Sequence, residues 1–193
     1  KFNKTDGLNP IDHFTYTFLG DGCLMEGISH EVCSFAGTHG LGKLICFYDQ
    51  NNISIDGEIE NWFTDNTTQR FESYNWQVLE VDGHNVEQIL EAIKNAQAES
   101  SRPTLICCKT EIGFGSPNKA GTSGVHGSAL GEEEIIKTRD QLGWQHEPFD
   151  IPADIKSEWD AKEVGSKHNS EWDALMDEYS KMHPELSHEL KRL

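Results

Sequence analysis

The sequence predicts an α/β protein with a doubly wound, mostly parallel sheet and a C-terminal helical appendage. A near-continuous apolar run, residues 14–19, leads into Gly20-Asp21-Gly22, and a helix-like pattern follows at once. Segments of strand and helix character then alternate along the chain, which is typical of a parallel sheet covered by helices. After residue 131 the chain becomes charged and helical, without further strand-like runs.

The first strand and its turn indicate a ligand site. An apolar run of this kind predicts a strand that is buried on both faces of the sheet. Gly20 and Gly22 allow a sharp turn and a close approach of the backbone to a ligand. The helix that follows would direct its free N–H groups and positive dipole end at an anion. Asp21 would repel a phosphate unless a divalent cation lay between them, so we predict a metal–diphosphate site.

The next elements complete a βαβ unit. We predict one helix, ending near Gly40 or Gly42, because apolar residues three or four apart would form a buried face: Leu24, Ile28, Val32, Phe35 and Ala36. Within this helix Gly27 is unfavourable, and close packing would compensate for it. Residues 43–48 form a second strand that is parallel to the first, and a polar loop follows it. Asp21 and Asn51 would then lie on the same rim of the sheet and could meet one ion.

The remaining elements extend the alternation. Residues 53–57 end in a turn signal, and helices and strands follow. The helices are expected at 62–74 and around the apolar residues of 86–93, and the strands at 76–81 and 104–109. Residues 110–131 form a long connection rich in glycine that contains His126; loops of this length are usually lids, binding loops or disordered segments. We divide the chain into a diphosphate-binding part, 1–130, and a helical C-terminal part with linker, 131–193.

Composition restricts the partners. The formal net charge of −17 disfavours nucleic acid and anionic membranes, which bind basic surfaces. The chain has no secretory signal pattern and no apolar run near the ~20 residues of a membrane helix. Five cysteines without a C-x-x-C pair favour reduced thiols, mostly in strands, and a cytoplasmic location. The chain starts at Lys1 and enters its first strand early, so we expect a piece of a longer polypeptide.

Other nucleotide and metal sites fit the sequence poorly. A dinucleotide-binding Gly-x-Gly-x-x-Gly would need glycine where Met25 stands, and a phosphate-binding loop would need lysine where Ile28 follows Gly27. Zinc is unsupported because no cysteines and histidines occur as spaced pairs. The glycine-flanked aspartate therefore remains the main candidate.

Each candidate residue also has a simpler interpretation. Asp21 could only cap a helix, and Asn51 could be a plain turn residue. Glu26, one turn into the predicted helix, could only complement its dipole. His126 could be a solvated loop histidine. The residues by themselves leave these alternatives open.

Two stretches resemble the thiamin-diphosphate motif of transketolases, which runs from a Gly-Asp-Gly to an asparagine: GDGCLMEGISHEVCSFAG and LGKLICFYDQNNISIDG. The similarity continues through WFTDNTTQRFESYNW, IGFGSPNKAG, HGSALG and TRDQLGW, and so covers nearly all of the chain. The bare motif is shared by thiamin enzymes in general, whereas the longer stretches indicate transketolase in particular.

The resemblance implies the thiamin-diphosphate-binding fold, with thiamin diphosphate and Mg²⁺ (or Ca²⁺) as cofactors. Carried over from the motif, Asp21, the Asn51 side chain and the Ile53 carbonyl would hold the metal. Gly22 would bind the diphosphate through its N–H, and Asn51 would contribute to the same site. Ile55 would pack near the thiazolium ring.

Two further residues receive roles from the resemblance. Glu26 is similar to a family carboxylate that communicates across the dimer interface with the cofactor-activating glutamate. His126 is similar to a histidine in a mobile loop that touches the diphosphate and faces the sugar. The common HGAPLG is HGSALG here, with one proline fewer, and residues 123–125 also differ from the usual polar run. Both changes would alter the stiffness of the loop, but His126 remains.

The implied activity is that of transketolase: transfer of a two-carbon ketol unit between ketose and aldose sugar phosphates, in the pentose phosphate pathway, by a cytoplasmic homodimer. The pyrimidine-binding and C-terminal domains are absent, so we expect this chain to be inactive without the rest of a transketolase chain. Alternatives are dihydroxyacetone synthase, deoxyxylulose-phosphate synthase, a decarboxylating 2-oxo acid dehydrogenase, or a folded remnant that binds no cofactor.

Overall fold

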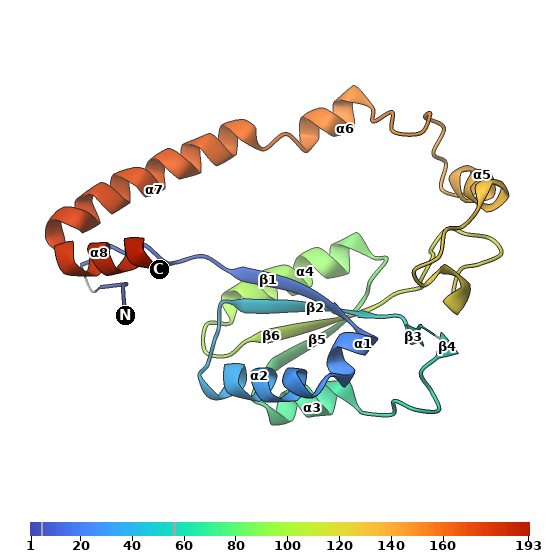
Figure 1. Cartoon of the computed structure of the whole chain (residues 1–193), viewed down its shortest axis with the longest axis horizontal. Coiled ribbons are helices and arrows are strands. Elements are labelled where there is room, and N and C mark those ends of the chain that lie inside the picture. The colour runs from blue at the N-terminus through green and yellow to red at the C-terminus, as the bar shows by residue number, and fades with distance from the viewer. Residues whose placement is uncertain (5, 56) are drawn as a thin grey trace. The chain divides into compact units, whose positions relative to one another are not determined.

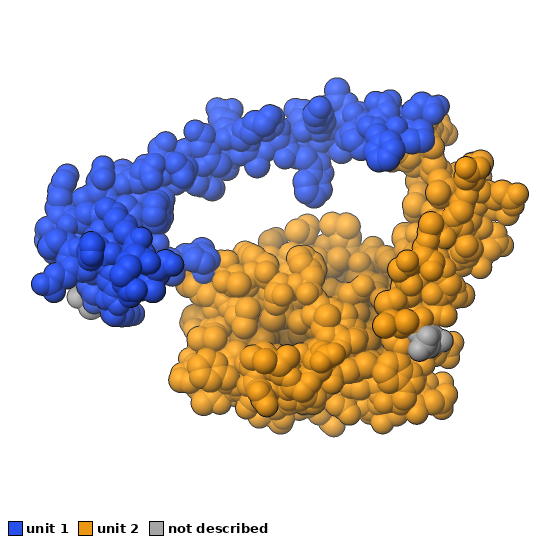
Figure 2. Space-filling view, viewed as in Figure 1, with its two compact units in different colours: residues 1–13, 146–193 blue, residues 14–145 orange. Residues whose placement is uncertain are grey.

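The structure, a computed structural model, describes residues 1–4, 6–55 and 57–193. The chain forms two compact units, coloured separately in Figure 2: residues 14–145, and residues 1–13 together with 146–193. The larger unit contains the sheet and every candidate site residue. Asp56, part of the turn expected at 53–57, lies outside the described residues.

The larger unit is built on a parallel sheet. In the part of the chain that the structure describes, four strands pair in the order β1-β2-β6-β5, all parallel. Their bounds are β1 Thr15–Gly20, β2 Leu44–Gln50, β5 Gln77–Asp82 and β6 Thr104–Lys109. A short antiparallel pair, β3 Ile53–Ser54 and β4 Gly57–Glu58, lies beyond β2. The predicted α/β class with a mostly parallel sheet is confirmed.

Helices cover both faces of the sheet, as expected for a doubly wound fold (Figure 1). The helices α2 Gly27–Thr38 and α3 Thr67–Ser73 lie on one face, and α4 Val86–Ala98 lies on the other. Strand residues alternate between the two faces. Tyr48 and Leu105 thus pack in the α2–α3 core, whereas Ile45 and Ile106 pack in the α4 core.

The prediction that β1 is buried on both faces is wrong. Among the strands that the structure describes, β1 lies at the edge of the sheet and pairs only with β2, and the side chain of Phe18 is 78% exposed. An apolar run shows that a segment favours the strand conformation and burial, but not which element covers it. Tyr16 and Phe18 contact Phe47 of the neighbouring strand, and this contact covers them only in part.

The single helix predicted after the turn is also wrong. The chain forms α1 Asp21–Met25 and then α2, separated by Glu26, whose backbone is extended at φ −68° and ψ 135°. Leu24 of α1 and Ala36 of α2 are buried as predicted, but Ile28, Val32 and Phe35 are exposed, so most of the expected apolar face of α2 does not face the core. The break ends the helical periodicity on which that prediction depended. Gly27 is not closely packed either, since a Cβ there would meet no atom within 4 Å.

Instead, α2 packs through a different set of residues. A Cβ on Gly37 would lie 1.7 Å from the carbonyl oxygen of Tyr74, so only glycine permits this close approach. The indole N–H of Trp76 donates a hydrogen bond of 2.8 Å to the carbonyl of Cys33. Both contacts join α2 to the turn between α3 and β5.

The cysteines are free thiols, as predicted. The described residues contain five free cysteines, and Cys46, Cys107 and Cys108 are buried in strands. Burial raises the pKa of Cys46 and of Cys107 to about 12. These thiols therefore stay protonated at neutral pH, in the form that reacts least.

The C-terminal part is helical, as expected. The helix α5 Glu132–Gln141 belongs to the larger unit; the smaller unit contains α6 Ala153–Glu158, α7 Lys162–Met182 and α8 Pro184–Arg192. In the smaller unit, Tyr179 and Trp172 of α7 donate hydrogen bonds of 2.8 and 3.1 Å to the carbonyls of Phe2 and Pro10. These bonds attach the N-terminal segment to α7. The sequence-based domain limits remain a prediction.

The connection between β6 and α5 is anchored by one carboxylate. Glu134, buried in α5, accepts hydrogen bonds from the Ser116 hydroxyl at 2.5 Å and from the Asn118 backbone and side-chain N–H groups at 2.8 and 2.9 Å. The Lys119 ammonium donates to the carbonyl of Leu130 at 2.8 Å. These contacts close the connection into an anchored loop.

His126 lies within this anchored loop. It directly follows the short 3-10 helix η1 Ser123–Val125, and its own N–H donates to the Ser123 carbonyl at 3.0 Å. The loop is therefore a folded segment held at both ends.

Removing core volume should destabilise the larger unit. Leu105 has no exposed surface and lies on β6 between two neighbouring strands, so we expect Leu105→Ala to lower the free energy of unfolding by about 2–5 kcal/mol. Urea unfolding measures this change. Ile136→Ala on exposed α5 is the control and should change stability by no more than about 0.5 kcal/mol. Equal effects of the two substitutions would contradict the core assignment.

The Glu134 anchor should depend on pH. Hydrogen bonds from Asn118 and Ser116 lower the pKa of Glu134 from 4.5 to about 2. Because the pKa is lower in the folded state, the contribution to stability is present above pH 4.5 and is lost as the pH falls toward 2.

We therefore expect the stability difference between the unsubstituted chain and Glu134→Gln to shrink as the pH falls through this range. Thermal unfolding at a series of pH values measures it. Glu133→Gln, at the exposed neighbouring carboxylate, should show no such trend. A pH-independent effect of Glu134→Gln would contradict the assigned role.

Candidate functional site

β1 and β2 bring the first candidate residues to one rim of the sheet. Gly20, the last residue of β1, lies opposite Asp49 of β2 in the parallel register. Asp21 and Asn51 therefore follow the carboxyl ends of two neighbouring strands, where ligands of open α/β sheets usually bind. The expectation that they share a rim is confirmed.

The carboxylate of Asp21 is buried and fixed from two sides. Its side chain is almost completely enclosed, since the residue is 2% exposed. The Tyr48 hydroxyl donates to Oδ1, and the Asn52 backbone N–H donates to Oδ2 at 3.1 Å. Burial and the bond to Asp21 raise the pKa of Tyr48, which keeps this hydroxyl protonated as a donor. Asp21 is the first residue of α1 and not its N-cap, which is Gly20, so the simple capping role is excluded.

Asn51 forms a turn that leaves one oxygen lone pair available. Its Oδ1 accepts a hydrogen bond of 3.0 Å from the Ile53 N–H, and its Nδ2 lies 3.4 Å from Asp49 Oδ2. The next residue, Asn52, has a left-handed backbone with φ 61°, which asparagine tolerates better than most residues. The turn role of Asn51 is therefore present. Because an amide oxygen has two lone pairs, the same atom can also face a cation.

The glycines of the turn leave open space in front of it. A Cβ on Gly20 or Gly22 would meet no atom within 4 Å. Gly20 has a φ of −110°, which other residues adopt easily, and Gly22 is not among the residues with positive φ. Packing and backbone strain in the described chain therefore do not require glycine at either position. The open space is available to a ligand that approaches the backbone closely.

Cavities lie on both sides of Asn51. One, of about 770 Å³, is lined by Tyr48, Asn51 and Ile53 together with residues of α3. The other, of about 850 Å³, is lined by Gly20, Asn51 and residues of β6 and α4. Both lie within the larger unit, so the rim has room for a ligand on either side.

Three further candidates have exposed side chains: Glu26, Ile55 and His126. Ile55 is 76% exposed, whereas the neighbouring Ile53 is buried. Within residues 1–4, 6–55 and 57–193, no hydrogen bond joins any of the three to Asp21 or Asn51. A role of these three side chains in the site would therefore require a cofactor, a substrate or a second subunit that contacts them.

Sequence reasoning missed Tyr48 and the Asn52 N–H as partners of Asp21. Tyr48 lies in the apolar strand KLICFY, where it reads as one more core residue. A buried tyrosine hydroxyl usually needs a hydrogen-bond partner, and this rule is the one signal that could have indicated it.

Among the described residues, no three His, Cys, Asp or Glu side chains gather into a metal-binding cluster. A cation beside Asp21 would therefore need amide and carbonyl oxygens as its other protein ligands. The helices of the described chain include none that is long and apolar enough to span a membrane.

Comparison with known proteins identifies the family of the chain. The profile of the family described as transketolase, thiamine diphosphate binding domain, matches residues 1–193. Transketolase 1 of Pasteurella multocida and transketolase 2 of Escherichia coli are 59% and 57% identical over all 193 residues. The chain spans only 29% of the length of each of these relatives.

Solved structures of transketolases have the same fold. The Pichia stipitis enzyme in complex with sedoheptulose-7-phosphate is 41% identical, with a TM-score of 0.90, over 98% of this chain and 28% of that chain. The Leishmania mexicana enzyme is 36% identical, with a TM-score of 0.90, over 97% of this chain and 28% of that one. From its sequence, its fold and the site at the rim of its sheet, the chain belongs to the transketolase family and represents the thiamine diphosphate binding domain of that family.

Proposed function

We propose that this chain holds the diphosphate and metal end of thiamine diphosphate in a transketolase, which transfers a two-carbon ketol unit between ketose and aldose sugar phosphates. The main support is the buried, doubly hydrogen-bonded carboxylate of Asp21 beside a glycine turn with open space in front of it. A carboxylate in this place would bind a divalent cation, and the bound cation would attract the anionic diphosphate.

The metal is Mg²⁺ or Ca²⁺, held by Asp21, the Asn51 amide oxygen and the Ile53 carbonyl. Hard divalent cations prefer such oxygen ligands, and diphosphate oxygens complete their shell. The Tyr48 and Asn52 hydrogen bonds orient Asp21 in advance, which reduces the ordering cost of binding.

The other candidates contact the cofactor and the substrate. The N–H of Gly22, at the start of α1, donates to the diphosphate, and the exposed Ile55 side chain packs against the thiazolium ring. His126, in its anchored loop, lies near the diphosphate and the sugar. Glu26, in the break between α1 and α2, communicates with the activating glutamate of a second subunit.

Thiamine diphosphate, when bound, supplies the group that accepts the two-carbon unit and passes it on. The chain fixes the metal through Asp21, orients the diphosphate through Gly22 and forms one wall of the site through Ile55. Because the diphosphate end of the cofactor would be fixed in this way, its reacting end would take a defined position relative to the chain.

The substrates and partners follow from this role. Sugar phosphates are the substrates, and the enzyme is a cytoplasmic homodimer of the pentose phosphate pathway that includes pyrimidine-binding and C-terminal domains. Two observations support the sugar phosphate substrates and the further domains: the chain matches less than a third of the relatives' length, and three of the similar solved structures are complexes with sugar phosphates. Residues 1–130 form the diphosphate-binding part, and residues 131–193 form its helical extension and linker.

The metal role of Asp21 can be tested in a chimera in which these 193 residues replace the matching segment of the Escherichia coli transketolase 2. Asp21→Asn keeps the size of the side chain but removes its charge. We expect the thiamine diphosphate concentration for half-maximal ketol transfer to rise at least about tenfold at fixed Mg²⁺. Asp140→Asn, at an exposed carboxylate of α5, should leave it unchanged. If Asp21→Asn retained the cofactor normally in the presence of a chelator, the metal role would be wrong.

The chain alone should have no ketol transferase activity, because the groups expected to bind the aminopyrimidine and the sugar phosphate lie outside it. The assay uses a ketose phosphate donor and an aldose phosphate acceptor, with saturating thiamine diphosphate and Mg²⁺. Calorimetry on the same sample distinguishes a chain that binds the cofactor from an inert remnant. Turnover by the isolated chain would refute this proposal.

A further inference from the structure

The C-terminal end of α1 is held by two side chains to which nothing above assigns a function. α1 has five residues, and its N-terminal end carries Asp21 and Gly22. A helix this short is not stable by itself, and its last carbonyls have no partners within the helix. Tyr48 and Asn52 fix the N-terminal end through Asp21. What fixes the other end therefore decides the direction of the whole helix.

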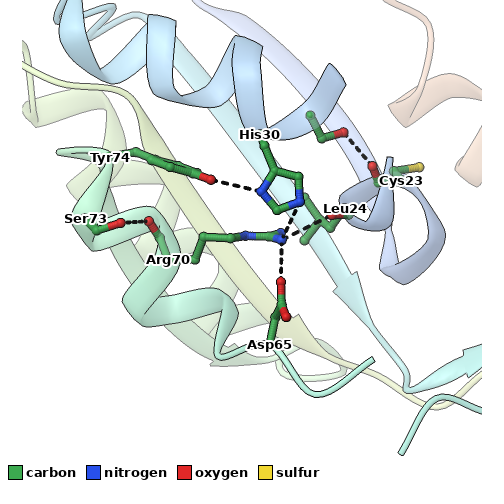
Figure 3. Close-up of polar contacts among 8 residues, drawn as sticks. Cys23, Leu24, His30, Asp65, Arg70, Ser73 and Tyr74 are labelled. Carbon is green, nitrogen blue, oxygen red and sulfur yellow. Dashed lines mark hydrogen bonds and ion pairs between the residues drawn. The ribbon is translucent and has the colours of Figure 1, made fainter. Parts of the chain in front are cut away.

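Ser29 and Arg70 bind the last carbonyls of α1. The Ser29 hydroxyl donates to the carbonyl of Cys23 at 2.5 Å, and Nη1 of Arg70 donates to the carbonyl of Leu24 at 3.2 Å. Figure 3 shows Arg70 reaching from α3 toward Leu24, His30 and Asp65. The guanidinium places a positive charge at the C-terminal end of α1, where the helix dipole favours it.

Arg70 itself is rigidly held. Its carbon Cζ lies 5.9 and 5.6 Å from the ring centroids of Phe63 and Phe71, and its side chain is only 12% exposed. Asp65 accepts a hydrogen bond from Nη1 at 3.0 Å. Nε is buried and has no hydrogen-bond partner among the described residues. The arrangement thus leaves the buried Nε without a partner and directs Nη1 at the end of α1.

His30 connects this group to α2. Its Nε2 lies 3.3 Å from Nη1 of Arg70, and its Nδ1 lies 3.1 Å from the Tyr74 hydroxyl. Because the guanidinium can only donate, a hydrogen bond here requires Nε2 as the acceptor and the ring proton on Nδ1, and the two N–H groups of Nη1 are then shared among His30, Leu24 and Asp65. One guanidinium therefore joins α1, α2, α3 and the segment before α3.

We propose that Arg70 and Ser29 are positioning residues for the cofactor: they cap α1 from its C-terminal end and so keep Asp21 and the Gly22 N–H aimed at the diphosphate–metal site. The inference rests on the proposed function. It assigns to these residues no contact with the cofactor, since they act through the backbone of α1. Their loss should weaken cofactor retention and leave the chemistry of the loaded enzyme unchanged.

The test uses the chimera described above, with thiamine diphosphate titrated at fixed Mg²⁺. Arg70→Gln should raise the half-saturating cofactor concentration about tenfold, and Ser29→Ala about threefold, with kcat at saturating cofactor unchanged. A merely structural role would lower the folded fraction but leave cofactor affinity in the folded molecules unchanged. Ser29→Ala removes a single hydroxyl group, so it still tests the inference if Arg70→Gln does not fold.

Two matched controls remove similar bonds elsewhere. Arg102→Gln breaks the pair with Glu99 at the opposite end of the sheet, and Ser73→Ala removes a serine that donates at 2.7 Å to the Arg70 carbonyl without touching α1. Neither should change the half-saturating concentration. Unchanged cofactor affinity in folded Ser29→Ala and Arg70→Gln would overturn the inference while leaving the proposed function intact. If the unsubstituted chimera showed no dependence on thiamine diphosphate, the proposed function would fail, and the inference with it.

Discussion

The geometry of the site depends on one buried carboxylate. Asp21 lies where two parallel strands end, and it accepts hydrogen bonds from two neutral groups, the Tyr48 hydroxyl and the Asn52 N–H. Both donors are neutral, whereas a basic partner in a salt bridge would compete with a cation for this carboxylate. The left-handed backbone of Asn52 and the turn closed by the Asn51 side chain hold the loop in which the Asn52 N–H donates to Asp21. This arrangement is the basis of the proposed cation site at the rim.

The same carboxylate connects distant parts of the chain. It links the start of α1 to β2 and the loop after it, while Arg70 links the end of α1 to α2 and α3. Since α1 is so short, its orientation is set by these side chains more than by its own backbone bonds. The anchored loop that carries His126 follows the same rule, because Glu134 fixes it from α5. Rigid elements thus position the loops from which the site is built.

The strands and the shared rim could be predicted from sequence, because apolar runs and Gly-Asp-Gly are local signals. The exposure of Phe18 and Val32 could not, because burial depends on which other element covers a surface. The break at Glu26 could not be predicted from a proline or a typical capping residue, because neither occurs there. In the described chain no side-chain hydrogen bond caps α2, the helix that begins after the break. Bonds such as Tyr48–Asp21 and Arg70–Leu24 join residues far apart in sequence, and such pairs leave no periodic pattern in a single chain.

Gly37 and the two turn glycines, Gly20 and Gly22, are subject to different constraints. At position 37 a methyl group would collide with the Tyr74 carbonyl, so every folded descendant must keep glycine there, whatever it binds. At positions 20 and 22 a methyl group would fit, so the fold itself tolerates a side chain there. Substitution of Gly37 therefore probes folding, whereas substitution of Gly20 or Gly22 would leave the packing intact and probe what enters the open space in front of the turn.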